Sequence, residues 1–141
     1  KEQRRQRIFE KVLDAAATSP YARMCTRWVL AGFGNGARIA AVVGGRCRGS
    51  MAGFLFMAYP LTETMPTSKG AVLPDSLPPL TKLSAPLCFM MSTNEIGGGD
   101  GGGATAAALA AALPKLPSEE VRCLQLDGVD GAWLPPPQHR A

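Results

Sequence analysis

The sequence has one histidine, no closely spaced cysteine pair and no apolar run longer than a strand. Zinc sites need ligands in close pairs. Four cysteines lie far apart, and only His139 could join them, so we expect no metal site and no bound cofactor. The absence of a spanning run predicts no membrane span. Free thiols and no signal-like segment predict an intracellular, reducing compartment, without choosing among cytosol, cilium, nucleus and organelle.

Acidic residues are also few, with 11 against 15 basic ones, for a net charge of +4. The basic excess is concentrated near the N-terminus, at Arg4, Arg5, Arg7 and Lys11. Such a run could contact nucleic-acid phosphates, but more often it is the solvated face of a helix. A 46% apolar content over 141 residues predicts one globular domain, residues 1–141.

Hydrophobic periodicity divides the chain into helices and strands. Apolar residues at helical spacing predict a helix over 2–17, and Asn35 to Gly45 predict another, closed by Gly44 and Gly45. A short helix is expected within 77–84 and an alanine-rich one over 104–113. Continuous apolar runs predict strands, the first of them covered on both faces; these runs are 26–32, 53–61, 85–92 and 120–126. The alternation predicts an α/β fold, a three-layer sandwich with a mainly parallel sheet.

Three segments have the composition of loops. Residues 61–80 are rich in proline, and 94–103 are rich in glycine. Residues 135–141 predict an extended tail.

The stretch GFGNGA after the first predicted strand carries the most chemical information. It satisfies G-x-G-x-x-G/A between a strand and a helix, the context of a phosphate-binding loop. That fingerprint also requires an acidic residue at the end of the next strand. The next carboxylate is Glu63, in the proline-rich segment, so the nucleotide-binding pattern is incomplete.

The same stretch fits the nucleophile elbow G-x-S-x-G. Gly32 and Gly36 occupy the flanking positions, and Gly34 stands where the serine would be. Several later segments resemble the α/β-hydrolases in the same order: FLFMAYPL, LSAPLCFMMSTNEIGG and VRCLQLDGVDGAWLPP. Together they resemble the small hydrolase-like family of the testis-expressed hydrolase-like proteins and the third subunit of the non-specific-lethal chromatin complex. Arg38 matches the arginine of that family's helix.

The resemblance implies a set of replaced catalytic positions. The nucleophile corresponds to Gly34, the histidine to Gly131, and the acid to Glu95, or to Asn94 with a one-residue shift. We therefore expect a catalytically inactive domain that is a structural or protein-interaction subunit of a larger assembly. The resemblance also implies that strands preceding the elbow are missing, so the chain would be the C-terminal part of a hydrolase fold, with about four strands after its first helix.

Two alternatives stay open. Glu95 and His139 could activate a water molecule in a non-standard hydrolase. The backbone amides of 34–36 could instead bind a nucleotide through the GFGNGA loop.

Overall fold

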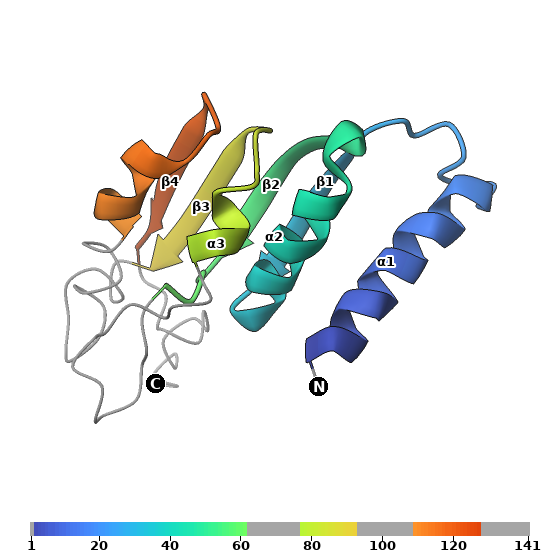
Figure 1. The fold of residues 1–141 in the computed structure, drawn as a ribbon, viewed down its shortest axis with the longest axis horizontal. Coiled ribbons are helices and arrows are strands. Elements are labelled where there is room, and N and C mark those ends of the chain that lie inside the picture. The colour runs from blue at the N-terminus through green and yellow to red at the C-terminus, as the bar shows by residue number, and fades with distance from the viewer. Residues whose placement is uncertain (1, 62–76, 93–108, 128–141) are drawn as a thin grey trace, which may run out of the picture.

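The computed structural model describes residues 2–61, 77–92 and 109–127. Its strands form from the four continuous apolar runs, although β1 begins at Trp28 rather than at residue 26, and β2 spans Met51–Met57. Figure 1 shows the elements in chain order: α1 (Glu2–Thr18), β1 (Trp28–Phe33), α2 (Asn35–Arg46), a 3-10 turn (Arg48–Ser50), β2 (Met51–Met57), α3 (Leu77–Leu80), β3 (Leu87–Ser92), a helical turn at 109–112 with a 3-10 turn (Leu113–Lys115), and β4 (Val121–Leu126).

The four strands form one sheet in the order β1-β2-β3-β4, and every neighbouring pair is parallel. One row of the sheet places Leu30 beside Phe54, Phe54 beside Leu87, and Leu87 beside Val121. Parallel neighbouring strands require crossover connections, and each connection between consecutive strands contains a helix or helical turn. The predicted α/β class with a parallel sheet is confirmed.

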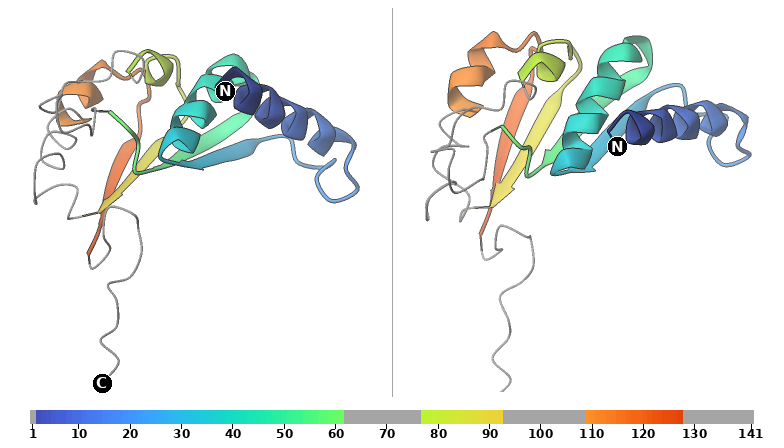
Figure 2. Two further views of the ribbon diagram at one scale, coloured as in Figure 1. Left: turned by 90° about the horizontal axis from the view of Figure 1, so that it is seen from below. Right: turned by 60° about the horizontal axis from the view of Figure 1, so that its bottom comes forward.

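All the helices of the described residues lie on one side of this sheet, and the core lies between them and the strands (Figure 2). The rings of Phe56 and Phe89 have centroids 5.4 Å apart, and both side chains are almost completely buried. Ala37, Ala40 and Ala41 of α2 are fully buried, so this helix lies close to the strands. Burial of each large side chain contributes about 1.5–3 kcal/mol.

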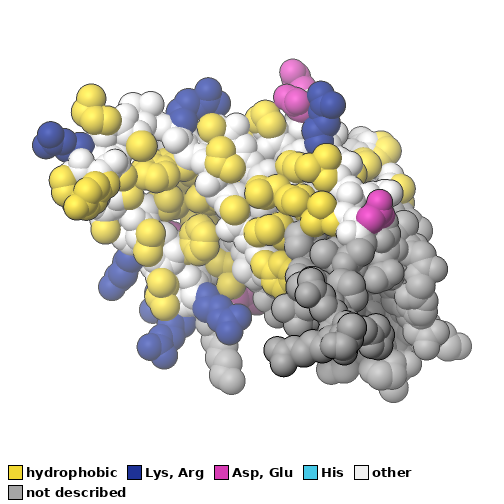
Figure 3. Space-filling model, turned by 180° about the vertical axis from the view of Figure 1, so that it is seen from behind, with side chains coloured by type: hydrophobic (Ala, Val, Ile, Leu, Met, Phe, Trp, Pro, Cys, Tyr) yellow, Lys and Arg dark blue, Asp and Glu magenta, His cyan; other side chains and the backbone are white. Residues whose placement is uncertain are grey.

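The opposite face of the sheet, which we call the back face, is not covered by any described helix. One row across the four strands brings together Phe33, Met57, Met90 and Leu124. Phe33 is 47% exposed and Leu124 is 49% exposed, and Figure 3 shows hydrophobic side chains spread over this face. The prediction that the first strand is covered on both faces is therefore wrong for the described residues, which form two of the three expected layers.

α1 is attached to α2 by two ion pairs and a small apolar contact. Arg38 pairs with Glu2, and Arg46 donates to Glu10 at 2.6 Å. The apolar side chains that pack toward the core are Phe9 and Leu13. The basic side chains on the rest of α1 are exposed to solvent; these are Arg4, Arg5, Arg7 and Lys11.

The glycines near the end of α2 have a different role from the predicted one. The helix continues through Gly44 and Gly45 to Arg46. A Cβ on Gly44 would lie 2.1 Å from the Phe54 ring, so glycine here allows that ring to pack against the helix. The prediction that these glycines close the helix is wrong because packing against β2, and not backbone freedom, requires the smaller residue.

All four cysteines are free thiols, as predicted, but none is fully buried. Cys25 and Cys123 are exposed, and Cys47 and Cys88 are half-buried. Cys88 and Cys123 lie within apolar runs of the sequence, which predicts that they are buried. That prediction is wrong because Cys88 faces the uncovered side of the sheet and Cys123 lies on the outermost described strand.

Several predictions fall outside the described residues. These are most of the proline-rich segment 61–80, all of 94–103 and 135–141, and the first half of the alanine-rich helix. None of the helices within the described residues is long and apolar enough to cross a membrane.

Candidate functional site

A sharp strand–turn–helix joins β1 to α2 through one residue, Gly34. Its φ is 53° and its ψ is −124°, a conformation that residues with side chains rarely adopt. The Gly34 amide donates a hydrogen bond to the Met57 carbonyl (2.9 Å), and its own carbonyl accepts one from the Ala37 amide (3.0 Å). These bonds fix the turn both to β2 and to the first turn of α2.

The three glycines of this turn have different surroundings. A Cβ on Gly32 would lie 2.5 Å from the Gly36 carbonyl and the Ala37 nitrogen, so only glycine fits where β1 passes α2. A Cβ on Gly34 or on Gly36 would meet no described atom within 4 Å. A side chain at position 34 would therefore point into open space, as a nucleophile on an elbow does.

The predicted catalytic positions lie only partly within the described residues. Gly34 is described, and it carries no side-chain atom that could attack a substrate. The other candidates lie outside the described residues: Glu95, Asn94, Gly131 and His139. Their distances from the turn therefore stay untested.

β2 ends beside the Gly34 turn, because the carboxyl ends of the parallel strands β1 and β2 lie along the same side of the sheet. The chain leaves it through Ala58, whose φ of 47° is uncommon for alanine and whose amide donates to the Met90 carbonyl (3.0 Å). Nothing in the sequence signals this conformation, since alanine has no special preference for it. Residues 58–61 include no carboxylate, so the described end of β2 lacks the acidic group of a ribose-binding fingerprint.

Arg38 connects α2 with two other segments near the turn. It forms an ion pair with Glu2 of α1, and its Nε is buried with no hydrogen-bond partner among the described residues. Tyr59 is 3% exposed, and its burial raises the pKa of the phenol well above the ordinary value. The Arg38 charge lowers that pKa and the Glu2 charge raises it, and both effects are smaller than the effect of burial. The phenol is therefore neutral at pH 7 and has no role as a base there.

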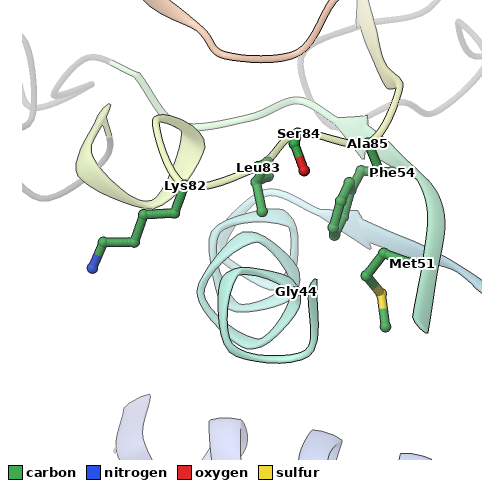
Figure 4. A pocket seen from close by; sticks show the side chains of 7 residues that line it. All are labelled: Gly44, Met51, Phe54, Lys82, Leu83, Ser84 and Ala85. Atoms are coloured by element: carbon green, nitrogen blue, oxygen red, sulfur yellow. The ribbon is translucent and has the colours of Figure 1, made fainter. Parts of the chain in front are cut away.

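A small pocket lies at the other end of α2, lined by Gly44, Phe54, Lys82 and their neighbours (Figure 4). Its volume of about 10 Å³ holds about one water molecule. Gly44 is ten residues from Gly34, or about 15 Å along the helix, so this pocket does not belong to the turn. Among the residues that the structure describes, no group of three or more His, Cys, Asp or Glu side chains could hold a metal ion.

The fold, with its strand–turn–helix at Gly34, is that of the α/β-hydrolases. A dienelactone hydrolase from Anabaena variabilis ATCC 29413 matches 87% of this chain with a TM-score of 0.63 at 14% identity. A monoacylglycerol lipase from Paleococcus ferrophilus matches 90% with a TM-score of 0.60 at 9% identity. A structure of the metagenome-derived lipolytic enzymes LipS and LipT matches 83% with a TM-score of 0.56 at 11% identity.

This chain spans only part of each of those structures, namely 47% of the dienelactone hydrolase, 65% of the monoacylglycerol lipase and 61% of the lipolytic enzyme. At such low identities the likeness shows the fold alone. No protein-family model matches the sequence, and no curated protein matches it either.

Proposed function

We propose that this chain is a catalytically inactive α/β-hydrolase-like domain that serves as a structural or protein-interaction subunit of a larger assembly. The observation that carries the proposal is Gly34. The turn has the positive φ of an elbow and open space beside it, but no side chain. A Ser–His–acid mechanism without the attacking oxygen cannot form an acyl-enzyme.

Two further observations support the proposal. The sequence resemblance to the testis-expressed and non-specific-lethal subunit family implies that Gly131 corresponds to the histidine, so the proposed domain would lack the general base as well. The back face exposes Val29, Phe33 and Leu124, at 62%, 47% and 49% of their surfaces. Apolar surface of this kind, gathered on one side of a fold, is typical of a contact with another protein.

The inactivity can be tested with a fluorophosphonate probe and with p-nitrophenyl acetate. We expect no labelling and no hydrolysis above the rate in buffer. The matched variant is Gly34→Ser, which places a hydroxyl in the open space beside the turn; we expect it to stay inactive because position 131 holds no histidine.

Turnover by the natural chain would contradict the proposal. If Glu95→Gln abolished that turnover, the chain would be a water-activating hydrolase that uses Glu95. Saturable binding of NAD that is lost in Gly36→Val would instead support a nucleotide-binding loop.

A further inference from the structure

The segment between α1 and β1 contains a serine that is followed by a proline, Ser19-Pro20. Of the 12 prolines in the chain, this is the only one that follows a serine or a threonine. Protein kinases of the proline-directed class transfer phosphate to a serine or threonine in this dipeptide. The sequence therefore contains a single acceptor for that class, and the structure shows whether a kinase can reach it.

Pro20 keeps Ser19 in the backbone shape that a kinase requires. A proline disfavours the helical conformation in the residue before it and favours an extended one. Ser19 directly follows Thr18, the last residue of α1, and lies outside the helix. Kinases bind their acceptor within an extended segment. The acceptor is therefore already outside α1, and only the residues just before it must leave the last turn.

The hydrogen bonds that hold this turn are local. The Ser19 amide donates to the Ala16 carbonyl (3.1 Å). The Ser19 carbonyl accepts from the amides of Ala22 (3.2 Å) and Arg23 (2.9 Å), and the Ser19 hydroxyl oxygen accepts from the Tyr21 amide (3.3 Å). None of these bonds joins the turn to the sheet or to α2. The turn can therefore open without loss of a hydrogen bond to the rest of the domain.

The side chains around Ser19 are exposed. Tyr21 is 95% exposed and Met24 is 85% exposed. Pro20 and Arg23 are exposed as well, and Ser19 itself is half-buried. Figure 2 shows the segment projecting beyond the end of α1, on the side of the molecule away from β4. Local opening of the turn is therefore enough to present the Ser19 hydroxyl to an enzyme.

We propose that Ser19 is a phosphorylation site for a proline-directed serine/threonine kinase that uses ATP. The Ser19 Oγ attacks the γ-phosphorus of ATP, the bond from that phosphorus to the oxygen of the β-phosphate breaks, and ADP leaves. The hydroxyl proton passes to the catalytic carboxylate of the kinase. This modification goes beyond the proposed function and does not depend on whether the domain hydrolyses esters.

Phosphate on Ser19 brings the positive charge of this surface close to zero. Residues 15–27 contain Arg23 and Arg27 and no acidic residue. A phosphoserine carries about −1.5 to −2 charges at pH 7, which offsets both arginines. Arg27 donates to the Met51 carbonyl at 3.5 Å, whereas the Arg23 backbone bonds to Ser19 and its side chain is exposed. Arg23 is therefore the partner for the phosphate within the segment.

The fold tolerates a phosphate at this place. The α1 dipole disfavours an anion at the C-terminal end of the helix, and the pairing with Arg23 acts in the opposite direction. The ion pairs that attach α1 to α2 start from Glu2 and Glu10, more than two turns before Ser19. Far-UV circular dichroism of the phosphorylated chain should therefore match that of the unmodified chain. Loss of the α1 signal would refute the local character of the site.

The main experiment compares the 141-residue chain with the free peptide DAAATSPYARM, which is residues 14–24. Each is incubated with a purified mitogen-activated protein kinase, Mg²⁺ and ATP labelled at the γ-phosphate, and mass spectrometry locates the phosphate. We expect phosphate on Ser19, with kcat/KM for the chain within about tenfold of the peptide value, because local turns open at little cost. A chain that is slower than this, phosphate on other residues alone, or no phosphate on either substrate would overturn the proposal.

Three variants identify the residues that matter. Ser19→Ala should abolish phosphorylation of the chain. Pro20→Ala should lower kcat/KM at least about tenfold, because the residue before it loses its preference for an extended backbone. The matched control is Thr18→Ala, which removes the neighbouring hydroxyl and its bond to the Ala15 carbonyl (3.1 Å), and its kcat/KM should not fall. Undiminished phosphorylation of Ser19→Ala or of Pro20→Ala, or a Thr18→Ala variant as slow as Pro20→Ala, would refute the assignment.

Discussion

Alanine substitutions at Gly32, Gly34 and Gly36 separate three physical effects within one turn. At Gly32, a Cβ would lie 2.5 Å from backbone atoms at the start of α2, and backbone cannot move aside as a side chain does. Overpacking of this kind costs about 3 kcal/mol. At Gly34, the surrounding space is open, so only the positive φ is costly, by about 1–2 kcal/mol.

Gly36 should respond with the opposite sign. It lies in the first turn of α2, and a Cβ there would meet no described atom within 4 Å. Alanine is the better helix former by about 0.5–1 kcal/mol. We therefore expect Gly36→Ala to stabilise the domain.

Urea unfolding followed by far-UV circular dichroism measures the three differences. Domains have about 5–15 kcal/mol of stability, so a loss of about 3 kcal/mol leaves a folded protein to measure. The expected order of stability, from highest to lowest, is Gly36→Ala, the natural chain, Gly34→Ala and Gly32→Ala. A Gly32→Ala variant within 1 kcal/mol of the natural chain would refute the close approach of β1 to α2. A destabilising Gly36→Ala would refute the open space assigned to that residue.

Two further measurements test the packing of α2 at Gly44 and the burial of Tyr59. Gly44→Ala should lower the free energy of unfolding in urea by about 2 kcal/mol because the new Cβ meets the Phe54 ring. Gly45→Ala should lower it much less, because the Cβ there would lie 3.3 Å from the Lys82 Cβ. Equal losses in the two variants would count against this packing. Because burial raises the pKa of Tyr59, the folded state holds the phenolic proton more tightly, and stability should fall as the pH rises above about 10, the pKa of an unfolded tyrosine. Tyr59→Phe should make that fall shallower, and an unchanged slope would show that other groups cause it.

The element order could be predicted from the sequence because it depends on local patterns. Each strand is a continuous apolar run, and α1 shows helical spacing from residue 2 onward. Repeated strand and helix segments favour parallel pairing, so the fold class followed as well. The turn at Gly34 was also recognisable, since glycines at 32, 34 and 36 between a strand and a helix are a local signal.

Features that depend on distant parts of the chain could not be predicted in this way. An apolar strand has the same sequence whether one face or both are covered, so the exposure of Val29 was not predictable. Gly44 resembles a helix end in the sequence, and only the position of the Phe54 ring explains why it lies inside α2. The pairing of Arg38 with Glu2 joins residues 36 positions apart, a separation over which the sequence shows no pattern.

The strand order β1-β2-β3-β4 has a consequence for how this sheet assembles. Each strand pairs with the next strand along the chain, about 25 to 35 residues away, as Leu30 with Phe54 or Phe54 with Leu87. The entropy of closing such loops rises only slowly with their length. The sheet can therefore grow during synthesis in the order in which its strands leave the ribosome. None of these four described strands must be inserted between two others, so each addition among them needs one new edge contact and no rearrangement of earlier ones.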